Sequence, residues 1–217
     1  MNRFTPKHPI GQVSDSRIAT AIMAVATLAV LAGGEGSRMG APKSHLQLGG
    51  EAILAFLHKR FQWRGPTMLV TAPGFEKPAV ADRFDKEVSD PVAGVGPLRG
   101  VLTALENAET EIVVIATVDM PGIARVQLEW IADRLGDRMG LMIAREDRIE
   151  PFPSAWRRSA APLIASQLAQ NRRAVHGLAK IDGLATIPPP SDWPDETWIN
   201  LNTPDDLRAF ESKLEKR

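Results

Sequence analysis

Apolar and polar positions alternate along the chain with two periods, and this alternation predicts strands and helices in turn. Residues 27–32 (TLAVLA), 67–72 (TMLVTA) and 111–119 (EIVVIATVD) are short apolar runs typical of buried strands. Residues 51–61 and 97–108 instead carry apolar side chains at the three-to-four-residue spacing of helices. The first half of the chain therefore reads as strands separated by helices.

The rest of the chain continues the same pattern. We expect helices near residues 77–84, 125–137 and 161–170, and a strand at residues 140–144. Strands that alternate with helices form a mainly parallel sheet with helices on both faces. The predicted fold class is α/β, a Rossmann-like three-layer αβα sandwich.

The two ends of the chain differ in character. Residues 1–22 are polar, contain prolines and lack periodicity, so we expect a poorly structured extension before a single domain at residues 23–217. The last element begins with Asn-Thr-Pro-Asp-Asp-Leu. Thr203 can cap a helix there, Pro204 suits its first turn, and Asp206 stands where a capping box places its acid.

Composition narrows the possible partners and compartments. Lys plus Arg equals Asp plus Glu at 26 each, so net charge provides no attraction to nucleic acid or to an anionic membrane. The chain has no cysteine, which excludes disulfides and thiolate metal sites. Residues 18–34 lack charge, but the segment is short and only moderately apolar for a membrane span. Cleavage of a signal peptide near Ala32 would divide the glycine-rich loop, so we expect a cytoplasmic protein.

That loop, Gly-Gly-Glu-Gly-Ser-Arg-Met-Gly-Ala-Pro-Lys, follows the first predicted strand directly. It fails the Rossmann fingerprint because Met39 occupies the third glycine position, and it fails Walker A because two residues separate Gly40 from Lys43. Exposed backbone N–H groups followed by a guanidinium and an ammonium suit a triphosphate. A glycine-rich turn with incidental charge is the alternative.

Four segments resemble a known family in the same order along the chain. They are LAGGEGSRMGAPKSHLQLGG, GVGPLRGVLTAL, ATVDMPG and WINLNTPDDL, and together they span roughly residues 26–210. They are similar to the signature segments of the molybdenum cofactor guanylyltransferase (MobA) family of nucleotidyltransferases. The resemblance implies a fold like that of nucleotide-diphospho-sugar transferases, also called GT-A-like.

The resemblance also implies roles for individual residues. It makes Arg38, Lys43 and Asp119 catalytic, with Lys43 on the phosphates, Arg38 on the leaving pyrophosphate and Asp119 on Mg²⁺. The implied nucleotide-binding residues are Leu31, Ala32, Gly33, Gly34, Gly36, Ser37, Lys43, Asp90, Gly96, Pro97 and Asp119. Asn200 and Asn202 are the expected acceptor-binding residues.

The position of Asp119 along the chain also supports a role in ligand binding. It closes the apolar run 111–119, so it should project at the carboxyl edge of the sheet, where open α/β sheets bind ligands. A carboxylate there can hold Mg²⁺ together with substrate phosphates. The alternative is an aspartate that only starts the turn before Pro121. Asn200 and Asn202 offer amide donors and acceptors to a pterin or a phosphate, or they only satisfy loop turns.

The implied activity is transfer of GMP from GTP to molybdopterin with release of pyrophosphate. Its implied cofactor is Mg²⁺, its substrates are GTP and molybdopterin, and molybdoenzyme maturation proteins are candidate partners; neither nucleic acid nor a membrane is expected. A molybdopterin cytidylyltransferase, or a nucleotidyltransferase acting on another metabolite such as a sugar phosphate, is the alternative. A non-catalytic nucleotide-binding maturation factor is the alternative from another class. The Gly33-Gly34 pair, where the cytidylyltransferase relatives show Ala-Gly, favours a purine.

Overall fold

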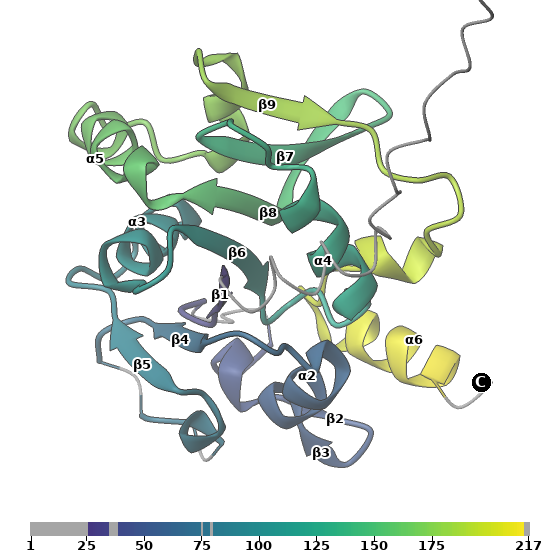
Figure 1. Cartoon of the computed structure of the whole chain (residues 1–217). Coiled ribbons are helices and arrows are strands. Elements are labelled where there is room, and N and C mark those ends of the chain that lie inside the picture. The colour runs from purple at the N-terminus through teal and green to yellow at the C-terminus, as the bar shows by residue number, and fades with distance from the viewer. Residues whose placement is uncertain (1–25, 35–38, 75, 79, 215–217) are drawn as a thin grey trace, which may run out of the picture.

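A seven-stranded sheet forms the centre of the protein (Figure 1). The computed structural model describes residues 26–34, 39–74, 76–78 and 80–214. In spatial order the strands are β5 (Lys86–Ser89), β4 (Thr67–Thr71), β1 (Ala26–Leu31), β6 (Ile112–Thr117), β8 (Arg148–Arg157), β7 (Gly140–Arg145) and β9 (Leu184–Ile187).

The sheet is mixed but mostly parallel, as expected. Strands β5, β4, β1 and β6 run parallel to one another, and β9 runs parallel to β7. Within this sheet, only β8 of the described strands runs antiparallel to its neighbours, β6 and β7. The four parallel strands therefore bring their carboxyl ends to one edge of the sheet, where ligand sites form in such folds.

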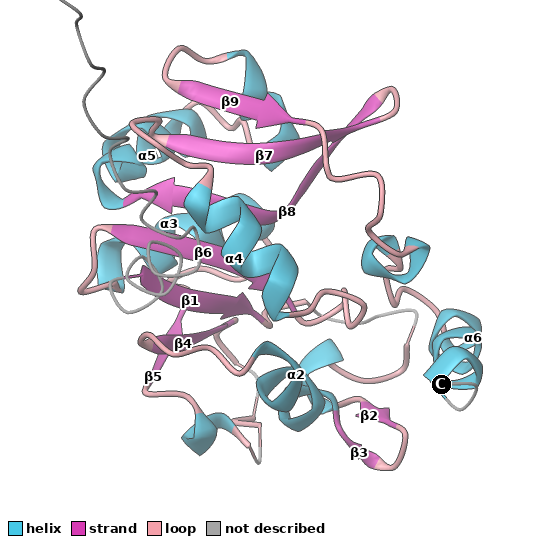
Figure 2. Cartoon of the chain, turned by 45° about the vertical axis from the view of Figure 1, so that its right-hand side comes forward, coloured by secondary structure: helices cyan, strands magenta, loops and turns pink. Residues whose placement is uncertain are grey.

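Helices cover both faces of the sheet, which gives the predicted three layers (Figure 2). Helices α3 and α5 pack together behind the sheet, and α2 and α4 lie in front of it. The helices are α2 (Ile53–Phe61), α3 (Pro97–Asn107), α4 (Arg125–Asp133), α5 (Ala161–Ala169) and α6 (Pro204–Leu214).

Short elements complete the chain. Strands β2 (Gln47–Leu48) and β3 (Glu51–Ala52) form a separate small hairpin. The 3₁₀ turns are η1 (Lys43–His45), η2 (Ala81–Arg83), η3 (Arg158–Ala160), η4 (Val175–Lys180) and η5 (Asp195–Trp198).

Several sequence-based boundaries were wrong. The helix expected at 77–84 is only the turn η2, because Pro78 lacks a backbone N–H and the chain becomes extended again by Phe84. Strand β6 ends at Thr117 rather than at Asp119, and α4 ends at Asp133 rather than at residue 137. No strand was expected where β8 and β9 lie. The prolines of β8 and its change from half-exposed to buried residues hide its period.

The capping box before α6 is confirmed. The Asp206 carboxylate accepts from the backbone N–H and the hydroxyl of Thr203 at 2.8 and 2.9 Å, and the Asp206 N–H donates to the Thr203 hydroxyl at 3.2 Å. This reciprocal bonding fixes where α6 begins and holds the loop that precedes it.

The core is a contiguous cluster of buried apolar side chains on both faces of the sheet. Trp156 of β8 is fully buried, and its indole N–H donates to the Ser154 hydroxyl at 2.9 Å. Within the described residues, no helix is both long and apolar enough to cross a membrane. The expected extension at residues 1–22 lies outside the described residues, and the cytoplasmic location stays a prediction.

Candidate active site

A cavity of about 730 Å³ opens at the carboxyl edge of the parallel strands. Its walls come from the ends of β1, β4 and β6, the loop before α3, the first half of β8 and the loop before α6. Crossovers in a parallel sheet leave this edge free of covering helices, which is why these distant segments can meet there.

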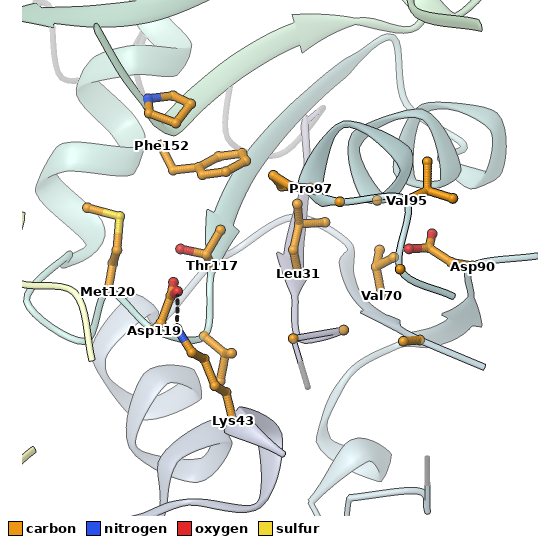
Figure 3. A pocket seen from close by; sticks show the side chains of 18 of the residues that line it. Leu31, Lys43, Val70, Asp90, Val95, Pro97, Thr117, Asp119, Met120 and Phe152 are labelled. Carbon is orange, nitrogen blue, oxygen red and sulfur yellow. Dashed lines mark hydrogen bonds and ion pairs between the residues drawn. The ribbon is translucent and has the colours of Figure 1, made fainter. Parts of the chain in front are cut away.

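One end of the cavity is built by Lys43, Asp119 and Asn202. Figure 3 shows the side chains of Lys43 and Asp119 facing each other there. The Lys43 ammonium donates to Asp119 Oδ2 at 2.8 Å and to Asn202 Oδ1 at 2.9 Å. The side chains of Lys43 and Asp119 are 14% and 25% exposed, so the pair is partly shielded from water but reachable from the cavity. Sequence reasoning therefore selected three residues that are direct neighbours in space.

Backbone contacts explain how distant segments hold this cluster. Lys43 begins η1, and its N–H donates to the carbonyl of Gly34 at 3.4 Å. The N–H of Leu201 donates to the carbonyl of Asp119 at 2.8 Å, which ties the loop before α6 to the end of β6. This hydrogen bond holds the loop where the Asn202 side chain reaches the Lys43 ammonium.

The paired glycines after β1 have different neighbours. A Cβ atom at Gly33 would lie 3.2 Å from both Cβ and N of Ala72, so β1 and the residue after β4 approach closely there. A Cβ atom at Gly34 would touch the Lys43 stem at 3.6 Å. Both glycines line the cavity, as does Leu31, whereas Ala32 is buried.

Three residues expected in the same loop, Gly36, Ser37 and Arg38, lie outside the described residues. Their assigned roles stay predictions.

The opposite end of the cavity is formed by Asp90 and the loop that leads into α3. Asp90 Oδ1 is buried and has no hydrogen-bond partner among the described residues. Burial raises the pKa of the Asp90 carboxyl, while a hydrogen bond from Thr103 and the charge of Arg99 oppose that rise. Gly96 has a φ of 94°, which a residue with a side chain rarely adopts, and Pro97 follows as the first residue of α3.

Thr117 lines the cavity wall and was missed by sequence reasoning. It is 9% exposed, and its Oγ1 has no hydrogen-bond partner in the described part of the chain. A single hydroxyl inside the apolar strand IVVIAT is the only signal in the sequence that could have drawn attention to it.

A third part of the wall comes from β8, a strand that was not expected. Glu150, Pro151 and Phe152 line the cavity there, and Met120 and Asn200 also belong to the lining. Glu150 is 13% exposed and its Oε1 lies 2.7 Å from the Arg148 Nε, so its charge is compensated. The Asn200 amide donates to the Trp198 carbonyl at 3.3 Å.

The donor set limits what kind of cation the cavity could hold. Among the described residues no three His, Cys, Asp or Glu side chains gather as a metal cage. Asp119 offers one carboxylate beside the glycine-rich loop. Mg²⁺ commonly binds through one or two carboxylates with the remaining ligands from water and substrate phosphates, so this donor set fits a substrate-bridged Mg²⁺.

Known proteins are similar to this chain in both sequence and fold. The family described as MobA-like NTP transferase domain matches residues 28–183. The molybdenum cofactor guanylyltransferase of Cereibacter sphaeroides strain ATCC 17029 is 32% identical over 195 residues, covering 86% of this chain and 96% of that protein.

Solved structures agree with this relationship. The molybdopterin-guanine dinucleotide biosynthesis protein A of Archaeoglobus fulgidus superposes with a TM-score of 0.74 at 26% identity, over 88% of this chain and 100% of that one. The 2-C-methyl-D-erythritol 4-phosphate cytidylyltransferase of Thermus thermophilus shares the fold, with a TM-score of 0.61 at 18% identity over 86% and 98% of the two chains. The matched segments, the overall fold and the cavity at the strand ends all agree. This chain belongs to the MobA-like NTP transferases and is an enzyme of the nucleotidyltransferase family.

Proposed function

We propose that the protein transfers GMP from GTP to molybdopterin and releases pyrophosphate. The observation that carries this proposal is the cluster of Lys43, Asp119 and Asn202 beside Gly33 and Gly34, at one end of a cavity of about 730 Å³. Cavities of a few hundred to a thousand Å³ suit small-molecule ligands. The names of the relatives support GTP and molybdopterin as the two substrates.

The charged side chains at the two ends of the cavity indicate which way the nucleotide lies in it. Phosphates suit the end where Lys43 supplies an ammonium and Asp119 would hold Mg²⁺, and they would be repelled by the carboxylate of Asp90 at the other end. The base therefore lies by Asp90, Val92 and Pro97. An ionised Asp90 would accept hydrogen bonds from the N1–H and 2-amino groups that guanine presents together.

The reaction is an in-line displacement without a covalent enzyme intermediate. An oxygen of the terminal phosphate of molybdopterin attacks the α-phosphorus of GTP, a new P–O bond forms, and the bond to the β-phosphate oxygen breaks. Pyrophosphate leaves with the bonding electrons. Lys43 turns from Asp119 to the phosphates and neutralises developing charge, and Arg38 acts on the leaving pyrophosphate. Positioning and charge stabilisation supply the catalysis.

Mg²⁺ is the cofactor we assign to this site, with Asp119 as its protein ligand. When bound, it would neutralise phosphate charge as a Lewis acid. Asn202 already contacts Lys43, so we assign it to the phosphate side of the reaction. We assign Asn200, which also lines the cavity, to the acceptor.

The test is pyrophosphate release with GTP, CTP, ATP and UTP, each with and without molybdopterin. We expect turnover only with GTP and molybdopterin together. Preference for CTP would indicate the cytidylyltransferase, turnover with a different acceptor would indicate another metabolite, and nucleotide binding without any release would indicate a non-catalytic maturation factor. Each of these outcomes contradicts the proposal.

A further inference from the structure

We propose that the hydroxyl of Thr117 binds a ribose hydroxyl of the nucleotide and thereby selects ribonucleotides over deoxyribonucleotides. This inference rests on the proposed binding of a nucleoside triphosphate. It does not depend on which base the site prefers or on the identity of the acceptor.

The first argument is the state of the hydroxyl itself. Thr117 is 9% exposed, and its Oγ1 has no hydrogen-bond partner among the described residues. Buried hydroxyl groups normally have a partner because an unsatisfied one is costly. Thr117 lines the cavity, so a ligand bound there can supply this partner in place of water.

The second argument is the direction of the side chain. Thr117 is the last residue of β6 and stands opposite Leu31, the last residue of β1, in a parallel pair. Paired residues of neighbouring strands point to the same face of a sheet. Leu31 points toward α3, because its Cδ atoms lie 3.2 and 3.3 Å from the position of a Cβ atom at Gly100. Thr117 therefore faces the side of the cavity under the start of α3.

The third argument is the order of the strands. Asp90 follows β5 and its N–H donates to the Thr71 carbonyl of β4, so it marks the β5–β4 end of the cavity. Asp119 follows β6. Thr117 ends β6 beside Asp119, and Leu31 of β1 lies between Thr117 and Asp90, as Figure 3 shows. With the base at Asp90 and the phosphates at Lys43 and Asp119, the sugar that joins them lies over Leu31 and Thr117.

The chemistry of the group fits a sugar. A threonine hydroxyl both donates and accepts, as a ribose hydroxyl does, whereas a phosphate oxygen needs a donor and is already offered the Lys43 ammonium. A neutral hydroxyl at this position recognises the part of a nucleotide that has no charge.

The experiment measures ribose selectivity in three proteins: the wild type, Thr117→Val and Thr117→Ser. Dissociation constants for GTP, 2′-deoxy-GTP and 3′-deoxy-GTP are determined by titration calorimetry, and kcat/KM for each is determined from pyrophosphate release. If another triphosphate binds more tightly than GTP, its ribo and deoxy forms are used. We expect the wild type to prefer the ribonucleotide over at least one deoxy form by about tenfold, the effect of one hydrogen bond to a neutral group.

Thr117→Val keeps the shape of the side chain but removes the hydroxyl, so it should lose that preference. It should bind the ribonucleotide as weakly as the wild type binds the deoxy form. Thr117→Ser should restore the preference. Thr71→Val is the matched control, since Thr71 ends β4 in the same way but its hydroxyl already donates to the Val88 carbonyl at 3.4 Å.

The proposal is overturned if Thr117→Val keeps the ribose preference, or if it weakens ribo and deoxy forms by the same factor. Absence of nucleotide binding in the wild type would overturn it together with the proposed function. Ribose-selective binding that depends on Thr117 but yields no pyrophosphate would support this inference and contradict the proposed function alone.

Discussion

Lys43 and Asp119 are 76 residues apart in the chain and form an ion pair of 2.8 Å at the cavity wall. Each partner is also held from elsewhere, Lys43 by the Asn202 side chain and Asp119 by the N–H of Leu201. A polyanionic substrate competes for the ammonium, and a cation competes for the carboxylate. The pair can therefore exchange its partners when a nucleotide and a cation arrive, without leaving either charge uncompensated.

The first prediction concerns Asp119. Asp119→Ala should fold normally and lose about 10²–10⁴-fold in turnover, the scale of removing one preorganised charge-stabilising group. Asp119→Asn should also be poor, because an amide keeps the shape but lacks the charge that a hard cation prefers. Pyrophosphate release and circular dichroism check both variants.

The matched control for Asp119 is Asp82→Ala. Asp82 also pairs with a lysine, Lys77, at 2.8 Å, but both side chains are more than half exposed and lie outside the cavity. An exposed pair of this kind contributes little. Near-normal turnover in a well-folded Asp119 variant would make Asp119 only a turn residue.

The second prediction concerns the base. GTP with Mg²⁺ should raise the melting temperature more than CTP with Mg²⁺ does, because a ligand that binds only the folded state stabilises it by mass action, by about 2.7 kcal/mol at a hundredfold excess over Kd. Differential scanning fluorimetry at matched nucleotide concentrations checks this. Equal or larger shifts with CTP would contradict the guanine assignment.

The third prediction concerns the pH dependence of Asp90. Burial raises the pKa of its carboxyl, so the folded state favours the protonated form. The ionised form therefore costs stability above that pKa, and the cost disappears as the pH falls below the pKa of the unfolded chain. Asp90→Asn should then melt higher than the wild type near neutral pH, and this gain should shrink as the pH is lowered toward the usual range of aspartate.

The same Asp90→Asn variant should bind GTP more weakly, because the amide replaces one acceptor by a donor. Paired thermal melts and GTP titrations distinguish the two effects. A variant that is less stable at neutral pH would contradict the cost assigned to the ionised carboxyl. A variant that binds GTP as well as the wild type would remove Asp90 from the base site.

The fourth prediction concerns Gly122, which precedes α4. A Cβ atom there would overlap the Glu196 carbonyl oxygen, so in Gly122→Ala either the loop that contains Gly122 or η5, which leads into the loop that carries Asn202, must shift. We expect a loss of about 1–3 kcal/mol in the free energy of unfolding, the usual cost of overpacking, together with reduced turnover.

Gly177→Ala is the control for Gly122, because a Cβ atom at Gly177 meets nothing within 4 Å. Urea denaturation of both variants, beside pyrophosphate release, is the measurement. Equal stability of the two variants would mean that the close approach of Gly122 to η5 does not matter for the site.

Local sequence determined the strands and loops that build this site. The apolar runs that became β1, β4 and β6 alternate with helical spacing, and this period needs no knowledge of the rest of the chain. The capping box of Thr203 and Asp206 is equally local, because its two members lie three residues apart. The glycine-rich loop, with Lys43 at its end, was recognisable because close backbone approach and phosphate binding favour that composition.

Only the tertiary structure decided which of these residues meet and which strands complete the sheet. Strand β8 could not be predicted because its prolines break the period and its stability comes from pairing with β6 and β7. The contact of Lys43 with both Asp119 and Asn202 joins three segments that no local pattern links. The buried, unpaired hydroxyl of Thr117 likewise exists only because β6 ends beside β1 at the cavity, since burial depends on which elements pack around a residue.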